Sequence, residues 1–379
     1  MKMLMTEQSQ MIKDLARKIA REKIAPKAQE VDEKGETPWE NIRLLAENGF
    51  FGIDVPEEYG GVGSDTAAHV SVVEEIAAAC ASTSVALSTQ ALTITPFLLA
   101  GTEEQKKKYV VPLATGTVLG SFGITEPGAG SDVSSIQTRA VKDGAGYRLN
   151  GHKIFITNAG DSEVYVIVAR TSEERTKGIS LFIVEKGTPG FSFGKKENKM
   201  GIRGSVTREL FLEDVYVPEE NLLGGEGEGF KILMNVFNIT RPVVGAQATG
   251  IAKGAYEYCL EYVKERKQFG KPIQHFQMVQ STLADMAMKI EASRLLVQKA
   301  AMMLDQNDED VIAYASMAKC FASDTAMQVT TDAVQLLGGN GFIKDYPVER
   351  MMRDAKITQI YEGTNQIQRI IIAKQILAD

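Results

Sequence analysis

The spacing of the hydrophobic residues changes twice along this chain, which limits the possible folds more than any other feature of the sequence. In the first third, apolar side chains recur at intervals of three and four residues, the pattern of an amphipathic helix. The first such stripe consists of Ile12, Leu15, Ala16 and Ile19. After Gly116 the apolar residues form short runs rich in Val, Ile, Phe and Tyr, separated by turn residues, which is typical of β-strands. From Lys231 the helical spacing returns, so the order predicts an α+β fold with a separate sheet region in the middle.

Length and composition are consistent with three domains of this kind. The chain has 379 residues, of which 44% are hydrophobic and 24% are charged, and this is typical of a globular protein with ample material for its core. A glycine-rich stretch at 224–230 separates the strand-rich region from the second helical region. We therefore predict a helical domain over residues 1–117, a β domain over 118–226 and a second helical domain over 227–379.

Charge and the numbers of cysteines and histidines exclude several classes of protein. Lys plus Arg is 42 and Asp plus Glu is 49, which gives a net charge of −7, and no run of five basic residues occurs. We therefore expect no nucleic acid partner. The three cysteines lie too far apart for a disulfide framework or a CxxC pair. The three histidines never fall within four residues of one another, which excludes a helical HExxH zinc site, and we expect no metal centre.

One long uncharged segment, 76–102, raises the question of a membrane span, which needs about 20 mainly apolar residues. The segment contains many Ser and Thr residues and a proline. We therefore interpret it as a buried helix with hydroxyl groups on one face, and we expect no membrane insertion. Residues 1–23 are charged throughout and lack the apolar core of a signal peptide. These features predict a protein of a reducing compartment, the cytoplasm of a bacterial-like cell.

Motifs for the commonest cofactor and nucleophile sites are missing from the sequence. Neither GxGxxG nor GxxxxGK[ST] occurs, so a nicotinamide-binding Rossmann domain and a P-loop lack their main support. Spacing alone does not exclude a Ser-His-Asp or Cys-His site, but the chain has no GxSxG elbow. Two other glycine-containing segments, 122–132 and 359–372, carry the remaining chemistry.

Each of these two segments has a functional and a purely structural interpretation. The first, FGITEPGAGSD, combines backbone N–H groups with the hydroxyls of Thr125 and Ser131, which suits a phosphate or a planar heteroatom ring. A simple β-turn at Pro127 explains it equally well. The second places Glu362 before a glycine and the start of a helix. This glutamate is either a catalytic carboxylate or a complement to the helix dipole.

Seven segments, in order, resemble the acyl-CoA dehydrogenases, which are flavoproteins of fatty acid β-oxidation. They are FGITEPGAGSD (122–132), KIFITNAG (153–160), ITRPVVGAQATGIA (239–252), ERKQFGKPI (265–273), TDAVQLLGGNGF (331–342), YPVERMMRDAKI (346–357) and IYEGTNQIQR (360–369). The resemblance covers essentially the whole chain and is strongest to the short- and medium-chain members that act on straight acyl groups. It implies a helical N-terminal domain, a small β-barrel-like or β-sandwich middle domain and a C-terminal four-helix bundle.

The resemblance also implies FAD as the cofactor. By motif, the residues that hold it within one subunit are Phe122, Ile124, Thr125, Gly130, Ser131, Phe155, Thr157, Thr364 and Gln366. Many relatives have Trp in place of Phe155. Other residues reach the diphosphate and adenine end of the cofactor from a neighbouring subunit, and these are Arg266, Phe269, Gln277, Gln335, Gly338 and Gly339. This arrangement implies a homotetramer built as a dimer of dimers.

Substrate residues follow from the same motifs. The resemblance assigns contacts with the acyl-CoA to Ser131, Asn238, Arg241, Tyr361 and Gly363, where Asn238 stands at a position that is commonly Asp. The uncharged segment 76–102 resembles the element that lines the acyl cavity. Its candidate wall residues are Ser84, Ser88 and Leu92, although ordinary core packing explains them as well. The segment carries no Arg to pair with a second carboxylate, which argues against glutaryl-type substrates.

The implied reaction is α,β-dehydrogenation of a short- or medium-chain acyl-CoA, with electrons passed to electron-transferring flavoprotein. It needs a base for the α-proton, a hydride acceptor for the β-carbon and donors that polarise the thioester carbonyl. Glu362 is the implied base, and its backbone N–H and a cofactor ribityl hydroxyl are the implied donors. Some branched- and long-chain relatives carry the base on another helix, at the position of Thr240 here, which cannot serve. In an acyl pocket that excludes water, the carboxyl of Glu362 should have a raised pKa.

Two alternatives remain open from the sequence. One is a member of the family that acts on a cyclic or aromatic-bearing acyl-CoA, or an oxidase that uses O2. The other is a flavin-bound protein that binds acyl-CoA or assists assembly without turnover. The presence of Glu362 argues against the second alternative.

Overall fold

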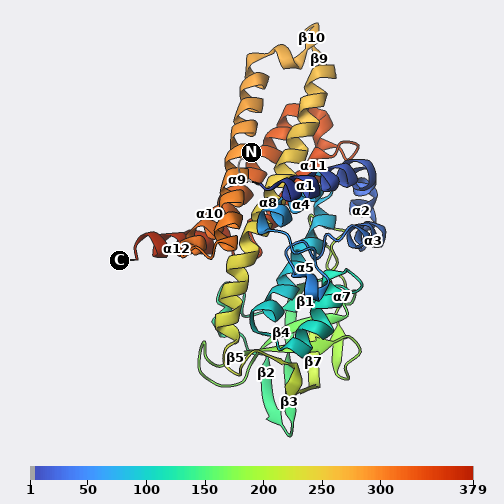
Figure 1. Cartoon of the computed structure of the whole chain (residues 1–379). Coiled ribbons are helices and arrows are strands. Elements are labelled where there is room, and N and C mark those ends of the chain that lie inside the picture. Colours follow the sequence, from blue (N-terminus) through green and yellow to red (C-terminus); the bar gives the residue numbers. More distant parts are fainter. Residues whose placement is uncertain (1–4, 379) are drawn as a thin grey trace.

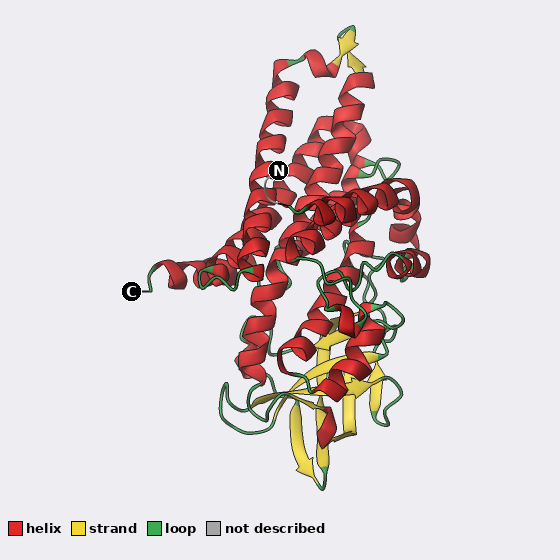
Figure 2. Cartoon of the chain, viewed as in Figure 1, coloured by secondary structure: helices red, strands yellow, loops and turns green. Residues whose placement is uncertain are grey.

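The computed structural model describes residues 5–378, so residues 1–4, the beginning of the charged N-terminal segment, and residue 379 lie outside it. Helices form both ends of the described chain and strands form its middle, which confirms the predicted α+β order (Figure 1, Figure 2). The helical regions pack together in the upper part of the view, and the sheet lies at the lower end.

The helices and strands follow one another in the predicted order. The N-terminal helices are α1 (Glu7–Ile19), α2 (Ala28–Lys34), α3 (Trp39–Glu47), α4 (Thr66–Ala79), α5 (Ala81–Ala100), α6 (Glu103–Gln105) and α7 (Val111–Ala114). The strands of the sheet are β1 (Gly120–Gly123), β2 (Arg139–Asp143), β3 (Gly146–Thr157), β4 (Val164–Arg170), β5 (Ile179–Glu185), β6 (Phe191–Phe193), β7 (Thr207–Pro218) and β8 (Leu222–Leu223). The C-terminal elements are α8 (Gly229–Glu265), β9 (Lys267–Gln268), β10 (Lys271–Pro272), α9 (Gln277–Asp305), α10 (Val311–Leu337), α11 (Val348–Thr358) and α12 (Asn365–Ile376).

The long uncharged segment forms two helices rather than one. It begins within α4, and the chain breaks at Cys80, which has the extended angles φ −154° and ψ 105°, before α5 starts at Ala81. Helix α5 is long and apolar enough to cross a membrane by length and composition, and 67% of its most apolar window is buried within the described protein. Its hydroxyls donate to carbonyls one turn back in the same helix, as Thr93 does to Thr89 at 2.8 Å.

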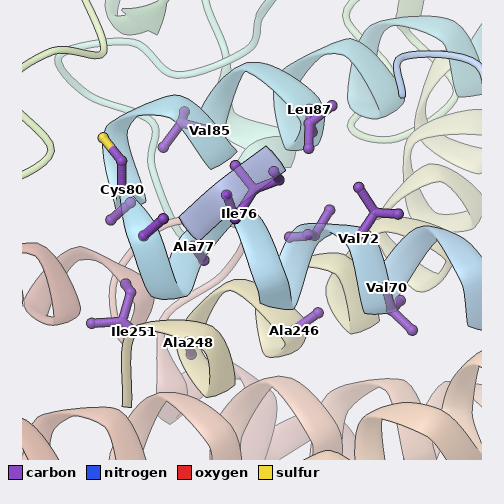
Figure 3. Packing of buried hydrophobic residues seen from close by; sticks show 14 of the residues in the cluster. Val70, Val72, Ile76, Ala77, Cys80, Val85, Leu87, Ala246, Ala248 and Ile251 are labelled. Atoms are coloured by element: carbon purple, nitrogen blue, oxygen red, sulfur yellow. The ribbon is translucent and has the colours of Figure 1, made fainter. Parts of the chain in front are cut away.

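The helical core is centred on the crossing of α4, α5 and α8. Figure 3 shows buried side chains of these three helices pointing toward one another, with Ile76 and Ala246 among them. Two glycines of α8 permit a very close approach to α4. A Cβ at Gly250 would lie 2.3 Å from the carbonyl oxygen of Glu74, and a Cβ at Gly254 would lie 2.3 Å from that of Ala78. This packing fixes α8 against the N-terminal helices.

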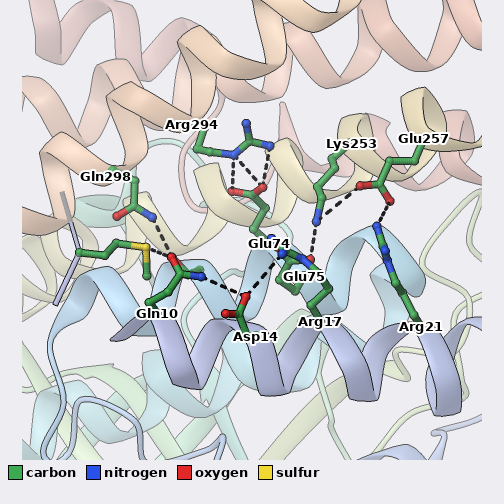
Figure 4. A network of polar contacts seen from close by, with 12 residues as sticks. Gln10, Asp14, Arg17, Arg21, Glu74, Glu75, Lys253, Glu257, Arg294 and Gln298 are labelled. Carbon is green, nitrogen blue, oxygen red and sulfur yellow. Dashed lines mark hydrogen bonds and ion pairs between the residues drawn. The ribbon is translucent and has the colours of Figure 1, made fainter. Parts of the chain in front are cut away.

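Buried charges hold the same helices together through ion pairs (Figure 4). Glu74 and Glu75 on α4 are each 2% exposed. Arg294 on α9 donates to Glu74 at 2.8 Å, Arg17 on α1 donates to Glu75 at 3.0 Å, and Lys253 on α8 also pairs with Glu75. Each of these two carboxylates therefore has a cation, as burial of charge requires.

The sheet runs in the order β6-β7-β3-β2-β4-β5-β8, and β1 pairs in parallel with β4. Strands β4 and β5 are buried over almost their whole length, because α5, α7 and the first half of α8 cover one side and the rest of the sheet covers the other. The β3–β7 ladder is irregular between Lys153 and Ile156. Phe155 lies in this bulge with φ 59° and is 63% exposed, so the bulge turns its ring away from the sheet.

Candidate active site

A cavity of about 340 Å³ lies where the sheet domain, α5, the first half of α8 and the segment before α12 meet. Residues far apart in the sequence form its wall. The sequence-predicted residues that line it are Ser88, Leu92, Phe122, Ile124, Thr125, Gly130, Ser131, Phe155, Thr157, Arg241, Tyr361, Glu362 and Gly363. The fold thus brings both glycine-containing segments of the sequence to one cavity.

The wall on the sheet side is the segment 122–132, which a buried ion pair holds in place. Lys153 on β3 is fully buried and donates to Glu126 at 2.7 Å and to the carbonyl of Ile124 at 3.1 Å. Burial lowers the pKa of Lys153 to about 8, although the charge of Glu126 opposes this shift. The backbone N–H of Ile154 donates to the carbonyl of Thr125 at 2.9 Å. The segment is therefore fixed to β3 before any ligand binds.

The same segment offers free donors to the cavity. The N–H groups of Gly130 and Ser131 make no hydrogen bond within residues 5–378. A Cβ at Gly130 would have no neighbour within 4 Å, so the space beside it is open. Phe122 and the outward-turned ring of Phe155 border the same cavity. Free N–H donors beside flat apolar side chains suit a planar ring that carries heteroatoms or phosphate.

The opposite wall is a sharp turn that presents Glu362. Glu362 has φ 55° and Gly363 has φ 89°, so both lie in the left-handed region. Two helices hold the carbonyl groups of this turn. Gln368 on α12 donates to the carbonyls of Glu362 at 3.1 Å and Gly363 at 3.0 Å, and Lys319 on α10 donates to that of Gly363 at 2.8 Å. A backbone in this sparsely populated region persists because its surroundings determine it.

Glu362 does not serve as the cap of the helix that follows it. Helix α12 begins at Asn365, and the hydroxyl of Thr364 accepts a hydrogen bond from the N–H of Ile367 at 3.3 Å. The side chain of Glu362 lies outside the helix and borders the cavity. The structural interpretation of this glutamate as a helix-dipole complement is therefore weaker than the sequence alone indicated.

The carboxylate of Glu362 has two polar neighbours on α8. The hydroxyl of Thr240 donates to Glu362 Oε2 at 2.9 Å, and the guanidinium of Arg241 lies near enough to attract the carboxylate. Protein atoms surround the carboxyl closely, and this burial raises its pKa, as expected from the sequence, while the Thr240 hydrogen bond and the charges of Arg241 and Lys319 oppose the rise. A carboxylate of this kind can accept a proton from a ligand in the cavity.

Arg241 is buried beside the cavity and is only partly satisfied by protein groups. It is 5% exposed, it donates to Oδ1 of Asn238 at 2.8 Å, and its Nε has no hydrogen-bond partner within the described chain. Burial lowers the pKa of Arg241 to about 10, so the side chain stays charged at neutral pH. Asn238 itself does not line the cavity. It lies one turn before Arg241 on α8 and orients the Arg241 side chain by accepting its hydrogen bond.

A polar network that connects α5, α8 and the Glu362 turn lies against the cavity, which Tyr361 lines. The hydroxyl of Tyr361 donates to Oε1 of Gln247, and Nε2 of Gln247 donates to the hydroxyl of Ser84 at 2.9 Å. Ser84 in turn donates to the carbonyl of Ala81 at 2.8 Å. Ser84 is therefore fully buried behind the wall, while Ser88 and Leu92 face the cavity.

The remaining predicted cofactor residues do not line this cavity. Thr364 caps α12, and Gln366 is exposed on that helix. A larger group gathers at the opposite end of the helical bundle, where Asn340 donates to the hydroxyl of Tyr262 at 2.8 Å (Figure 1). The exposed residues of this group are Arg266, Phe269, Gln277, Gln335, Gly338 and Gly339. They cannot reach the cavity of their own chain.

Sequence reasoning missed several residues that support the site, among them Thr240, Gln247 and Lys319. Thr240 was considered only as a failed base, whereas it hydrogen-bonds to Glu362. Gln247 and Lys319 had no assigned role, although each contacts the turn that carries Glu362. For Lys319 the sequence does contain a signal, because a lysine stands within the small and apolar run ASMAKCFAS of α10, where a charged residue is unusual.

Comparison with known proteins agrees with this geometry. The chain matches the family models described as the N-terminal, middle and C-terminal domains of acyl-CoA dehydrogenase over residues 6–117, 121–215 and 227–377. It is 47% identical to the short-chain specific acyl-CoA dehydrogenase of Clostridium acetobutylicum, with 98% of each chain covered.

Two solved structures are similar over almost their whole length. The butyryl-CoA dehydrogenase of Megasphaera elsdenii has a TM-score of 0.96 and 47% identity, with 98% of this chain and 99% of that chain covered. A chain in a structure described as the electron transferring flavoprotein of Acidaminococcus fermentans has a TM-score of 0.97 and 52% identity, with 99% of each chain covered. The matched family consists of flavoprotein oxidoreductases of β-oxidation, which implies a flavin cofactor. By family models, sequence and structure, this chain belongs to the acyl-CoA dehydrogenase family.

Proposed function

We propose that this protein uses FAD to oxidise a short- or medium-chain acyl-CoA to the trans-2-enoyl-CoA, with Glu362 as the base that removes the α-proton. The observation that carries the proposal is the position of the Glu362 carboxylate at the cavity, 2.9 Å from the hydroxyl of Thr240 and with its pKa raised by burial. A base with a pKa closer to the working pH accepts the α-proton with less loss of driving force.

The backbone of the same turn supplies a donor for the thioester carbonyl. The N–H of Glu362 makes no hydrogen bond within residues 5–378, so it is free to donate to a ligand oxygen. Negative charge grows on that oxygen as the α-proton leaves, and a donor already in position stabilises this charge without reorganisation. One residue therefore provides both the base and a donor for the developing enolate, because the left-handed turn directs its backbone and its side chain to one cavity.

The sheet-side wall fits the flavin that the family implies. The free N–H groups of Gly130 and Ser131, the open space beside Gly130 and the ring of Phe155 are the features that support FAD. Thr125 and Thr157 add hydroxyls along the same wall. Bound there, the flavin supplies the acceptor for the β-hydride.

The acyl end of the cavity favours short, uncharged groups. Leu92, Val85 and Val244 line the cavity together with Tyr361, which is hydrogen-bonded to Gln247. Extending the cavity would require burying these hydrogen-bonding groups unpaired, at a cost of about 1–3 kcal/mol each. Arg241 is the only cation among the lining residues of the described chain; Asn238 accepts a hydrogen bond from it, and the charge of Glu362 attracts it. A second carboxylate on the substrate would therefore have to compete with Glu362 for Arg241.

We further propose that electrons pass to electron-transferring flavoprotein and that the protein assembles as a homotetramer, a dimer of dimers. The exposed cluster around Phe269, which is 94% exposed, supports contact with another copy. The similarity to a chain in the structure described as the electron transferring flavoprotein of Acidaminococcus fermentans supports the redox partner. Arg266 and Gln335 would then complete the cofactor site of a neighbouring subunit.

The experiment is anaerobic bleaching of the yellow holoenzyme by a panel of acyl-CoA thioesters. We expect bleaching by butyryl- to octanoyl-CoA and poor bleaching by glutaryl-CoA, because a buried unpaired carboxylate costs several kcal/mol. A higher specificity constant for glutaryl-CoA than for butyryl-CoA would contradict the charge argument. A preference for a cyclohexane-type thioester would support the alternative substrate, which no feature of the cavity favours.

A further inference from the structure

A buried lysine lies directly behind the turn that carries Glu362. Lys319 is 0% exposed in the middle of α10. Its Nζ donates to the carbonyl of Gly363 at 2.8 Å and to Oδ1 of Asn365 at 2.9 Å. Lys319 therefore contacts the residues on the C-terminal side of Glu362, and it does so from a different helix than Gln368, which holds the turn from α12.

Lys319 differs from Lys153 and Lys253, two other buried lysines, in its counter-charge. Lys153 pairs with Glu126 and Lys253 pairs with Glu75, whereas no carboxylate lies within ion-pair distance of Lys319 in residues 5–378. Burying an ammonium among neutral acceptors is expensive, and burial lowers the pKa of Lys319 to about 8. Strongly perturbed buried charges cluster at functional sites, and this one lies against the turn that carries Glu362.

The charged groups around Lys319 single out Glu362 as the relevant partner. They are Arg241 on α8, Cys320 and Asp324 on α10, and Glu362 in the turn. Arg241 repels the ammonium, and Asp324 is already bonded to Arg369 at 2.5 Å and to the amide of Asn365. Burial raises the pKa of the Cys320 thiol, which is therefore neutral at physiological pH. Of the two carboxylates around Lys319, Asp324 and Glu362, only Glu362 has no ion pair within residues 5–378.

From this geometry we propose that Lys319 is a positioning residue for Glu362. Its ammonium fixes the carbonyl of Gly363, and with it the left-handed turn that directs the carboxylate and the N–H of Glu362 into the cavity. Its charge also stabilises the ionised form of Glu362, which is the form that can accept a proton. The inference rests on the proposed role of Glu362 as the base and extends it to a second helix, since no atom of Lys319 lines the cavity itself.

The two effects of Lys319 have separate consequences for the reaction. Loss of the hydrogen bond to Gly363 loosens the turn and slows proton removal at every pH. Loss of the charge raises the pKa of Glu362, because a nearby cation favours the carboxylate. The acid limb of the pH–rate profile should then move to higher pH by about one unit, which is a tenfold loss of rate below that limb.

The test compares Lys319→Met with Lys253→Met in the FAD-loaded enzyme. Both substitutions remove a buried lysine of similar length, but Lys253 belongs to the ion pairs between α1, α4 and α8 and contacts no part of the turn (Figure 4). The rate of anaerobic flavin bleaching by butyryl-CoA is measured across the acid limb for the wild type and for both variants. We expect the limb to move upward in Lys319→Met and to stay in place in Lys253→Met, even if Lys253→Met lowers thermal stability.

Two further variants keep the test decisive. Lys319→Arg retains a cation and should keep the acid limb near the wild-type position. Lys319→Gln retains a donor without charge, and it replaces Lys319→Met if that variant does not assemble with flavin. If Lys319→Met or Lys319→Gln binds flavin and its acid limb lies at the same pH as that of the wild type, the inference about Lys319 is wrong, while Glu362 can still be the base. Absence of bleaching in the wild type by every acyl-CoA would instead contradict the proposed function.

Discussion

Replacing Thr240 with valine removes one hydroxyl beside Glu362 and keeps the shape of the side chain. Thr240 is 2% exposed on α8, and its Oγ1 lies 2.9 Å from Glu362 Oε2. Valine at this position fills the same space, so the packing between α8 and the turn should persist. The substitution therefore isolates the effect of a single hydrogen bond on the proposed base.

The size of the effect follows from the charge of the acceptor. A hydrogen bond to an ionised group contributes about 1.5–3 kcal/mol, and one pKa unit corresponds to about 1.4 kcal/mol. The bond favours the carboxylate, so its loss raises the pKa of Glu362 further, by about one to two units. Because only the ionised form accepts the α-proton, bleaching should slow about tenfold or more below the acid limb. Well above the limb, the rates of variant and wild type should converge.

The assay is anaerobic stopped-flow bleaching by butyryl-CoA as a function of pH. Thr249→Val is the matched control, because Thr249 is also buried on α8 and its hydroxyl donates to the carbonyl of Gly245 at 2.8 Å rather than to Glu362. Thr240→Ser, which retains the hydroxyl, should keep the wild-type profile. An acid limb that is the same in Thr240→Val, Thr249→Val and wild type would refute the reasoning.

Two further predictions concern assembly and stability. Arg266→Ala should lower the flavin content per chain without unfolding the sheet domain, because Arg266 is exposed and far from the cavity of its own chain. Full flavin retention in this variant, or a flavin-loaded monomer in light scattering, would contradict a cofactor site shared between subunits. Asp354 is fully buried and accepts a hydrogen bond from the N–H of Ile202 at 2.5 Å, and burial raises its pKa from 3.8 to about 6. The folded state therefore binds this proton more tightly than the unfolded state, and this group destabilises the fold by up to about 3 kcal/mol as pH rises from 4 to 7. Asp354→Asn avoids that loss of stability and retains an acceptor for the N–H of Ile202. The Tm of the variant minus that of the wild type should therefore increase from pH 4 to pH 7. A Tm difference that does not change with pH would contradict the raised pKa of Asp354.

The parts of the fold that could be predicted are those where local pattern and tertiary burial agree. Strands β4 and β5 are continuous apolar runs between turn residues, as the pattern of short runs after Gly116 predicts. The prediction of the first buried helical stripe was only partly right. Leu15 is 43% exposed, and Lys13 takes its place on the buried face because Glu74 and Glu75 of α4 attract its ammonium. Hydrophobic spacing alone contains no information about such a partner.

The candidate site was predictable as a set of residues but not as an arrangement. The family resemblance identified Glu362 and the segment 122–132 as site residues, although each segment taken alone also has a purely structural interpretation. The contacts of Glu362 with Thr240 and of its turn with Lys319 depend on how α8 and α10 pack, with more than 40 residues between Lys319 and Gly363. The outward direction of the Phe155 ring depends on a β-bulge that no local sequence pattern predicts.

The most direct test of the account is single-turnover reduction of the flavin in Glu362→Gln. Glutamine keeps the size of the side chain and an acceptor for the Thr240 hydroxyl, but it cannot take up the α-proton. We predict that the variant folds, retains FAD and binds butyryl-CoA, and that the flavin is not bleached on the time scale of the wild-type enzyme. Bleaching of Glu362→Gln at close to the wild-type rate would show that another group removes the proton, and the central assignment would be wrong.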